Sequence, residues 1–487
     1  MTSKAIETIA KNAMVLYLAQ VITMGLGLVL VIFTARTLGE TNFGKLGFAQ
    51  SFTSIFVMLT DLGLSTVAIR EIARHKELTP RYLTNILAIK LILSLVTFTL
   101  IAISVNLLHY PHDTIIITYI TGVSLILGSF STFLRSIFRA FEKMEFEAAL
   151  NIFKGLIATV IGLIALSMGY GLLGIVIAYL IAGVVDVTAS LLIAVYKFAK
   201  PEFKLDMPFW KELIRLSLPF SGTALIGLIY SQITVVMLSI MSGDNPVGAY
   251  KAASVLVFSL IAIPDIFSFS IFPAMSRFYV SSKDSLVVTL EKSAKFLFMI
   301  GLPIALGSIL LADKFIFLAY GIGFKSSIIA LQILSLYLPL RFLNHATGYT
   351  LSAINKESLR AFGVTIATIA NVLLSIVLIP DLGLVGASIT TVLTEVILFL
   401  AYYYFTSKHF YRPRLRLIVI KPLFAGLLMC ILILYFRDIN IMLLVPAAAI
   451  VYFIALYQIK GIDDEDKKII KKAIRSIQLL NVTGRPK

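Results

Sequence analysis

The sequence predicts an all-α polytopic membrane protein, and three observations support this fold class. Of its 487 residues, 59% are hydrophobic and only 14% are charged, with a mean hydropathy of +0.95, which is too apolar for a soluble domain. Apolar runs of spanning length recur along almost the whole chain, and basic residues are concentrated between alternate runs. We expect about 14 transmembrane helices, arranged as two parallel six-helix bundles related by pseudo-two-fold symmetry plus two C-terminal helices.

The expected helices follow from the length of the apolar runs. A spanning helix needs about 20 mostly apolar residues. The runs that meet this requirement are 12–34, 44–68, 83–108, 114–137, 148–168, 172–196, 213–240, 247–272, 294–311, 326–351, 360–379, 383–405, 417–436 and 439–459. The first run is longer than the core of a signal peptide and lacks a small-x-small cleavage site, so it is expected to remain in the mature protein.

The distribution of basic residues predicts the orientation. With the N-terminus in the cytoplasm, 34 of the 42 Lys and Arg residues fall in inner segments, 5 in outer loops and 3 within spans. Such an asymmetry is what the positive-inside rule requires, and it places both termini in the cytoplasm. The protein is thus expected in the cell membrane as a multi-pass protein, and its charge of +16 needs no nucleic-acid partner to explain it.

Four short matches between the two halves indicate an internal repeat. Residues 44–49 match 248–253 and Asp61 matches Asp265, both at an offset of 204 residues; residues 171–174 match 383–386 and 140–143 match 353–356, at offsets of 212 and 213. Matches in the same order with nearly constant offsets indicate duplicated bundles. The predicted division is an N-terminal six-helix bundle (1–206), a C-terminal six-helix bundle (207–411), two extra helices (412–460) and a tail (461–487).

The tail combines an apolar face with many basic residues. Ile469, Ile470, Ala473, Ile474, Ile477 and Leu480 share one helical face, and five Lys and Arg residues surround it. This pattern predicts a cytoplasmic helix lying on the anionic inner leaflet. A solvated charged tail is the alternative interpretation.

Several features of the sequence together form a recognisable pattern: the segment from Phe33 to Gly44, Asp61-Leu62-Gly63-Leu64-Ser65 with Arg70-Glu71 behind it, the paired repeats and the two extra helices. In these features the chain resembles the polysaccharide transporters of the multidrug/oligosaccharidyl-lipid/polysaccharide exporter superfamily, which include the O-antigen-type flippases. The resemblance implies a flippase that moves a lipid-linked, polyprenyl-diphosphate oligosaccharide from the inner to the outer leaflet by alternating access, for surface polysaccharide or glycan biosynthesis.

Enzymatic function is disfavoured by the motifs. The sequence contains no P-loop, no HExxH and no GxSxG, and no loop is large enough to hold a sugar-processing site. Its single cysteine, Cys430, lies inside an apolar run, so neither a disulfide nor a cysteine-based metal site is expected. The sequence therefore predicts no catalytic residues, no metal site and no cofactor.

Basic residues inside spans are candidates for binding an anionic headgroup. Lys251 and Arg341 lie in predicted spans and Arg36 at the outer end of the first, and fixed cations there would offset the desolvation of a diphosphate. Alternatively, Lys251 snorkels to the outer interface and Arg341 pairs with an acid such as Glu395. Lys90 lies nearer an inner end, as does Arg135, and snorkelling is expected for both.

Four intramembrane acids could couple transport to sodium or protons, and these are Asp61, Asp265, Asp186 and Glu395. A structural alternative is that Asp61 and Asp265 cap broken helices or pair with basic residues. Asn344 and His345 are among the polar residues that could add hydrogen bonds to a sugar or between helices.

Two transport functions compete. The leading prediction is the lipid-linked oligosaccharide flippase, because in-span cations suit an anionic substrate. A cation-coupled multidrug or small-molecule exporter of the same superfamily is the alternative, for which twelve spans are more usual.

Overall fold

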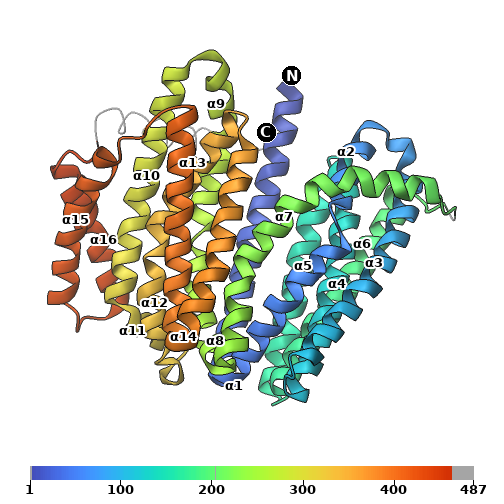
Figure 1. Cartoon of the computed structure of the whole chain (residues 1–487), viewed down its shortest axis with the longest axis horizontal. Coiled ribbons are helices and arrows are strands. Elements are labelled where there is room, and N and C mark those ends of the chain that lie inside the picture. Colours follow the sequence, from blue (N-terminus) through green and yellow to red (C-terminus); the bar gives the residue numbers. More distant parts are fainter. Residues whose placement is uncertain (1–2, 203, 463–487) are drawn as a thin grey trace, which may run out of the picture. The chain divides into compact units, whose positions relative to one another are not determined.

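A computed structural model describes residues 3–202 and 204–462, and within these ranges all regular structure is helical. Figure 1 shows the arrangement of the helices. Their order is α1 (Ser3–Val57), η1 (Met58–Thr60), α2 (Leu64–Arg74), η2 (Lys76–Leu78), α3 (Thr79–Leu107), α4 (His112–Ala140), α5 (Met144–Ser167), α6 (Gly171–Lys197), α7 (Met207–Ser242), α8 (Asp244–Ser259), α9 (Ala262–Ser281), α10 (Lys283–Leu310), α11 (Ala312–Ala319), η3 (Ile322–Phe324), α12 (Ser327–Ser335), α13 (Tyr337–Ala353), α14 (Glu357–His409), α15 (Leu415–Tyr435) and α16 (Ile441–Gln458).

Twelve continuous segments in the described part of the chain are long and apolar enough to cross a membrane. This number differs from the 14 separate helices predicted because α1 and α14 each contain two of the predicted runs. At 55 residues, α1 would be about 80 Å long if straight, whereas a bilayer core is about 30 Å thick. Each of these two helices is interrupted by one non-helical glycine, Gly39 in α1 and Gly383 in α14.

The chain reverses direction at both glycines. Leu30 and Ala49, on opposite sides of Gly39, lie in the same hydrophobic cluster, which a straight helix would not allow. Around Gly383, a Cβ added to Gly386 would overlap the backbone of Leu378, eight residues earlier. Both glycines have positive φ, 74° and 51°, a conformation that side-chain-bearing residues rarely adopt. The two arms of α1 and of α14 therefore correspond to separate predicted runs, and the total of 14 spans stays a prediction beside the twelve continuous segments.

The predicted repeat is visible in the backbone of the turns. Gly39 and Gly243 both have positive φ and are 204 residues apart; Gly171 and Gly383 share this property at an offset of 212. Two residues that are not glycine also have positive φ at positions 213 residues apart: Glu142 has φ 59° and Asn355 has φ 60°. Side chains other than glycine rarely occupy this region, so the shared conformation indicates that the two halves fold alike.

The chain divides into two compact units. Unit 1 comprises Met1–Val255, Ile316–Ala330 and Ala367–Thr390, and unit 2 comprises Leu256–Phe315, Leu331–Ile366 and Thr391–Lys487. In unit 1 the main cores lie between α1, α4, α5 and α6 and between α2, α3, α4 and α7. In unit 2, α9 and α10 pack on α13. The division at 206/207 between two bundles stays a prediction.

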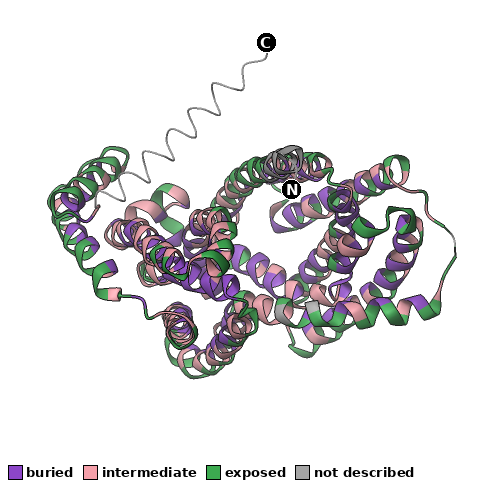
Figure 2. Cartoon of the chain, turned by 90° about the horizontal axis from the view of Figure 1, so that it is seen from above, coloured by how far each residue is buried: buried purple, intermediate pink, exposed green. Residues whose placement is uncertain are grey.

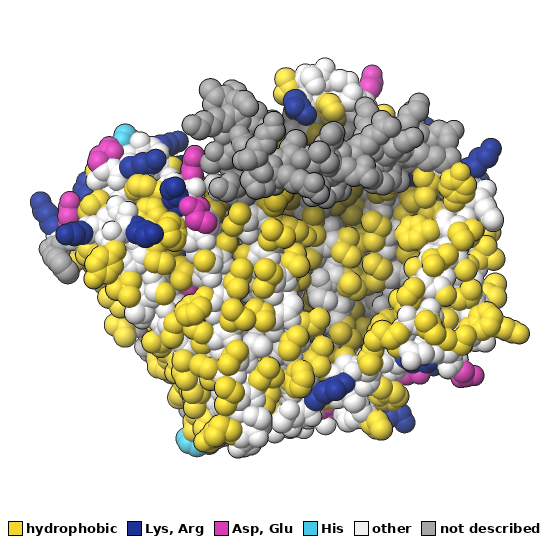
Figure 3. All heavy atoms as spheres, turned by 180° about the vertical axis from the view of Figure 1, so that it is seen from behind, with side chains coloured by type: hydrophobic (Ala, Val, Ile, Leu, Met, Phe, Trp, Pro, Cys, Tyr) yellow, Lys and Arg dark blue, Asp and Glu magenta, His cyan; other side chains and the backbone are white. Residues whose placement is uncertain are grey.

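The two extra helices pack on α10 in unit 2. A cluster around Met299, Met429 and the fully buried Tyr452 joins α10, α15 and α16. Figure 2 shows buried residues on the sides of helices that face their neighbours and exposed residues on the outward sides. Hydrophobic side chains cover the flank seen in Figure 3, and charged groups gather near the ends of the helices, as a membrane-embedded surface requires. The predicted amphipathic helix of the tail lies outside the described residues.

Candidate functional site

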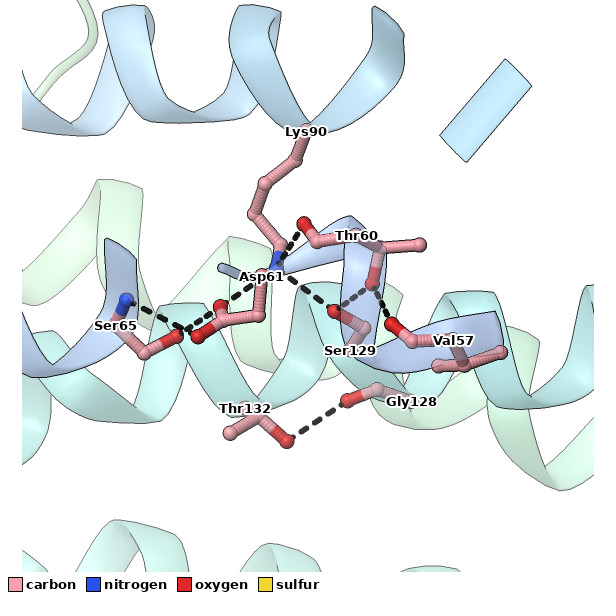
Figure 4. Close-up of polar contacts among 8 residues, drawn as sticks. All are labelled: Val57, Thr60, Asp61, Ser65, Lys90, Gly128, Ser129 and Thr132. Atoms are coloured by element: carbon pink, nitrogen blue, oxygen red, sulfur yellow. Dashed lines mark hydrogen bonds and ion pairs between the residues drawn. The ribbon is translucent and has the colours of Figure 1, made fainter. Parts of the chain in front are cut away.

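The first polar cluster inside a span surrounds the ammonium of Lys90. This α3 side chain is 0% exposed, and its Nζ donates to Asp61 Oδ1 (2.8 Å), to Ser129 Oγ (2.7 Å) and to the carbonyl of Thr60 (3.0 Å), as Figure 4 shows. Asp61 lies at the break before α2 and accepts from the backbone N–H of Ser65. The prediction that Lys90 snorkels is wrong, because three acceptors hold its charge within the helices. Of the two structural alternatives for Asp61, the ion pair with Lys90 confirms pairing with a basic residue, whereas the N-cap of α2 is Gly63.

A second cluster in unit 1 is built on the buried carboxylate of Asp186. Arg135 donates to this carboxylate and to Asn151 Oδ1, and Lys154 Nζ lies 3.5 Å from Asp186 Oδ2. Arg135 is thus buried and paired, so the prediction that it snorkels is also wrong. Lys154, assigned from the sequence to a cytoplasmic segment, lies inside α5.

Unit 2 contains the counterpart of this cluster. Glu395, 0% exposed, accepts a hydrogen bond from Asn344 Nδ2 (2.7 Å) and lies 3.6 Å from Arg341. Asn344 and Glu395 lie 209 residues after Arg135 and Asp186, which is three or four residues, about one helical turn, short of the repeat offsets of 212 and 213. The structural alternative for Arg341, pairing with Glu395, is confirmed. Both halves therefore join corresponding helices, α4 to α6 and α13 to α14, with a buried carboxylate.

Asp265 has a different environment from the other three acids. Its side chain is 59% exposed although it lies in the first turn of α9, within a candidate span, and its nearest ionisable partner is His345 Nδ1 at 3.6 Å. His345 is 8% exposed, and neither of its ring nitrogens has a hydrogen-bond partner. Because lipid would not solvate an ionised carboxylate, we expect this exposed side chain to face water.

Arg360 lies beside this pair and was not predicted. Its guanidinium donates to Ser352 Oγ (3.1 Å) and stacks over the ring of Tyr349 at 4.9 Å. Among the described residues, no carboxylate is within ion-pair distance of it. Arg341 and Arg360 act electrostatically on both Asp265 and His345. The i, i+4, i+8 spacing of Arg341, His345 and Tyr349 on α13 was the signal in the sequence that could have revealed this group.

Lys251 lines a small cavity in unit 1. The cavity has a volume of about 60 Å³ and is lined by residues of α1, α6 and α8, among them Thr34, Gln50, Tyr179 and Lys251. The Lys251 stem packs against Gly47, so closely that a Cβ there would lie 2.7 Å from Lys251 Cγ. Thr34 is 1% exposed, and its hydroxyl has no hydrogen-bond partner. Lys251 thus lines a small, mainly apolar cavity, and among the described residues no acid lies within ion-pair distance of its ammonium.

Arg36 has backbone partners. Its guanidinium donates to the carbonyls of Leu318 and Ala319 at the C-terminal end of α11, all within unit 1. Cations stabilise the carbonyl-rich end of a helix, so this contact holds α11 against α1. Nearby, Glu40 accepts a hydrogen bond from Ser326, and Phe43 packs against Phe324 with ring centroids 6.1 Å apart.

The structure therefore groups the predicted residues in separate places. Asp61 and Asp186 lie in different clusters of unit 1, and Lys251 lines a cavity of its own. In unit 2, Arg341 pairs with Glu395, and Asp265 lies against His345. No group of three His, Cys, Asp or Glu residues able to hold a metal ion exists in the part of the chain that the structure describes.

Comparison with known proteins decides the family. A family model described as "Polysaccharide biosynthesis protein" matches residues 9–279, more than half of the chain. The chain belongs to the polysaccharide biosynthesis protein family. It is a multi-pass membrane transporter of this family and is not an enzyme. The resemblance predicted from the sequence is confirmed.

Two relatives have low sequence identity to this chain but align with most of its length. A protein of Haloferax volcanii, named a probable low-salt glycan biosynthesis flippase, Agl15, is 23% identical over 79% of this chain and 81% of its own length. A protein of Escherichia coli, provisionally named an O-antigen transporter, is 25% identical over 74% of this chain and 88% of its own.

Solved structures share the fold. The lipid II flippase MurJ in an inward closed conformation has a TM-score of 0.74 at 17% identity and covers 91% of this chain and 98% of its own. An inward-facing multidrug resistance MATE family transporter has a TM-score of 0.64 at 20% identity, covering 80% and 95%. The predicted class, an all-α polytopic membrane protein, is thus confirmed.

Proposed function

We propose that the protein is a flippase that moves a polyprenyl-diphosphate-linked oligosaccharide from the inner to the outer leaflet by alternating access. The observation that carries the proposal is the presence of two cations, Lys251 and Arg360, without an acidic partner among the described residues. Lys251 lines a cavity of about 60 Å³, and the guanidinium of Arg360 contacts a hydroxyl and an aromatic ring. A diphosphate must shed water to cross the bilayer, and such cations replace part of its hydration.

Arg341 and Lys251 are the proposed substrate-binding residues, and Arg360 joins them. Arg341 retains a partly exposed side chain despite its contact with Glu395, so one edge of its guanidinium can meet a phosphate. Arg36 is instead assigned a structural role at the end of α11, because its guanidinium already donates to two carbonyls.

Alternating access is supported by the repeat and by the size of the cavity. Two halves with matching turns suit a pair of parallel bundles related by a pseudo-two-fold axis, which rock about a shared site. A cavity of about 60 Å³ has room for only a few water molecules, far less than an oligosaccharide needs. The site must therefore widen in another conformation to admit the substrate.

We propose that both termini of the protein lie in the cytoplasm. Its support is the excess of basic residues in one set of segments, 34 against 5. Moving Lys154 from an inner segment into α5 leaves this asymmetry nearly unchanged. The basic tail is proposed to meet anionic lipids of the inner leaflet.

The proposal is tested by translocation of a fluorescent polyprenyl-diphosphate oligosaccharide in reconstituted vesicles. Lys251→Gln and Arg360→Gln are each expected to slow translocation at least tenfold, whereas the matched control Lys211→Gln, at an exposed site, keeps the wild-type rate. Thermal unfolding of each variant separates lost function from lost fold. Wild-type rates in both folded variants would contradict the role of these cations.

The competing function is a cation-coupled multidrug exporter. One observation favours it, the exposed carboxylate of Asp265 at membrane depth, which could attract an organic cation. Uptake of an organic cation by the same vesicles, without movement of the lipid-linked oligosaccharide, would favour the exporter function over the flippase function.

A further inference from the structure

The four intramembrane acids divide into two classes by their partners. Asp61 is neutralised by Lys90, Asp186 by two basic residues, and Glu395 lies against Arg341 and Asn344. Each of these carboxylates thus lies within 4 Å of at least one Lys or Arg nitrogen. Asp265 has only the imidazole of His345 at 3.6 Å and faces water with more than half of its side chain.

His345 is a buried imidazole with unused hydrogen-bonding capacity. A neutral imidazole has one nitrogen that donates and one that accepts, and leaving both without partners in a buried place is costly. Neither nitrogen of His345 has a hydrogen-bond partner, and its ring stacks on Tyr349 at 6.0 Å. An acceptor nitrogen pointing toward a carboxylate is the arrangement that a shared proton completes.

The surrounding charges come from every helix that packs here. On α13, Arg341 lies one turn before His345, and Arg360 of α14 stacks over Tyr349, whose ring in turn stacks on that of His345. Glu395 lies on the far side of Arg341. The remaining charges on the two other packed helices are Arg277 on α9 and Lys283, Asp284, Glu291, Lys292 and Lys295 on α10, all nearer the helix ends at the connection between α9 and α10.

We infer that Asp265 and His345 form a proton-binding site in the C-terminal half, linked to the anionic headgroup through Arg341 and Arg360. The second part of this inference, the link to the anionic headgroup, rests on the proposed function. A proton from the facing water binds a carboxylate oxygen of Asp265, and the carboxyl O–H then donates to His345 Nδ1 or passes its proton to that nitrogen. On release, the proton returns to water along the same path, so no co-reactant is consumed.

The ligand chemistry favours a proton over sodium. Sodium is bound by several oxygen atoms, whereas the nearest partner of Asp265 is an imidazole nitrogen, which accepts protons. Ionised Asp265 competes with a phosphate for Arg341 and Arg360. Protonation removes this competitor, so the proton and the anionic headgroup favour each other's binding.

Proton uptake measures this linkage directly. A short-chain polyprenyl diphosphate is titrated into purified protein in weakly buffered detergent, and a pH dye reports protons taken up beyond those of the probe itself. We expect uptake on binding by the wild type, and its loss in Asp265→Asn and in His345→Gln. Asp381→Asn, the same substitution at an exposed acid, serves as the matched control and is expected to keep the uptake.

The outcomes separate the two proposals. Binding of the diphosphate without proton uptake overturns the proton site and leaves the flippase proposal standing. No binding overturns the flippase proposal. The proton site is then judged by infrared titration without ligand, where the protonated-carboxyl band must be absent from Asp265→Asn but present in Asp381→Asn. A band of equal size in the wild type and Asp265→Asn would refute it.

Discussion

Replacing Lys90 by methionine tests whether the buried cluster in Figure 4 holds unit 1 together. Methionine keeps most of the length of the lysine stem but removes a charge that has three acceptors, at 2.7, 2.8 and 3.0 Å. The substitution leaves the carboxylate of Asp61 and the Thr60 carbonyl without their common donor. Removing one partner of a buried ion pair costs about 3–5 kcal/mol, because the other charge stays buried and uncompensated.

The expected cost for Lys90→Met lies near the lower end, about 3 kcal/mol, because Asp61 retains 23% exposure and water can reach its carboxylate. Asp61→Asn alone should cost at least as much, since it strands a fully buried ammonium. The double variant Lys90→Met/Asp61→Asn should be more stable than the sum of the two single effects predicts.

The assay is reversible unfolding in mixed micelles, followed by circular dichroism, from which the free energy of unfolding is obtained for all four proteins. Lys211→Met, at an exposed site, controls for the loss of a lysine. A cost below about 0.5 kcal/mol for Lys90→Met, or strict additivity in the cycle, would refute the reasoning, because either would mean that the three acceptors do not depend on this ammonium.

Three other substitutions test local features. A Cβ at Gly44 would overlap the carbonyl of Asp244, so Gly44→Val is expected to cost about 1–3 kcal/mol in unfolding free energy, and an unchanged midpoint of thermal unfolding would contradict that close approach. A Cβ at Gly363 would lie 2.7 Å from Tyr402 Cε1, so Gly363→Ala is expected to lower the unfolding midpoint, and equal midpoints would show that the ring can move aside. A hydrogen bond from Arg81 holds the pKa of Asp206 below its ordinary value, so its stabilising effect is present at neutral pH and lost as the pH falls through that lowered pKa. In unfolding measured against pH, Asp206→Ala should therefore differ from the wild type near pH 7 and converge with it in acid, and a constant difference would contradict the pairing.

The helices could be predicted from the sequence because length and hydropathy decide what spans a bilayer. The repeat could be predicted as well, since glycines such as Gly171 and Gly383 mark turns that require positive φ. One of the four matches between the halves, 140–143 with 353–356, contains few identical residues. The structure shows that Glu142 and Asn355 in these segments nevertheless share a positive φ, which composition alone does not reveal.

The partners of the charged residues could not be predicted in the same way. Sequence position gives the depth of Lys90 or Arg135 along a helix, but not the neighbouring helix that its side chain meets. Both were therefore expected to snorkel, whereas Lys90 meets the carboxylate of Asp61 at the break before α2 and Arg135 meets that of Asp186 on α6. Arg360 was missed because it lies just inside a helix start and was counted as a loop residue.

The measurement that tests the central claim most directly compares three substrates in the same reconstituted vesicles: a polyprenyl-diphosphate oligosaccharide, the corresponding neutral lipid-linked oligosaccharide without phosphate, and an organic cation. The account predicts that only the diphosphate-linked lipid changes leaflet at a rate above that of protein-free vesicles, because Lys251 and Arg360 lack acidic partners. Equal translocation of the neutral lipid, or transport of the cation alone, would contradict it.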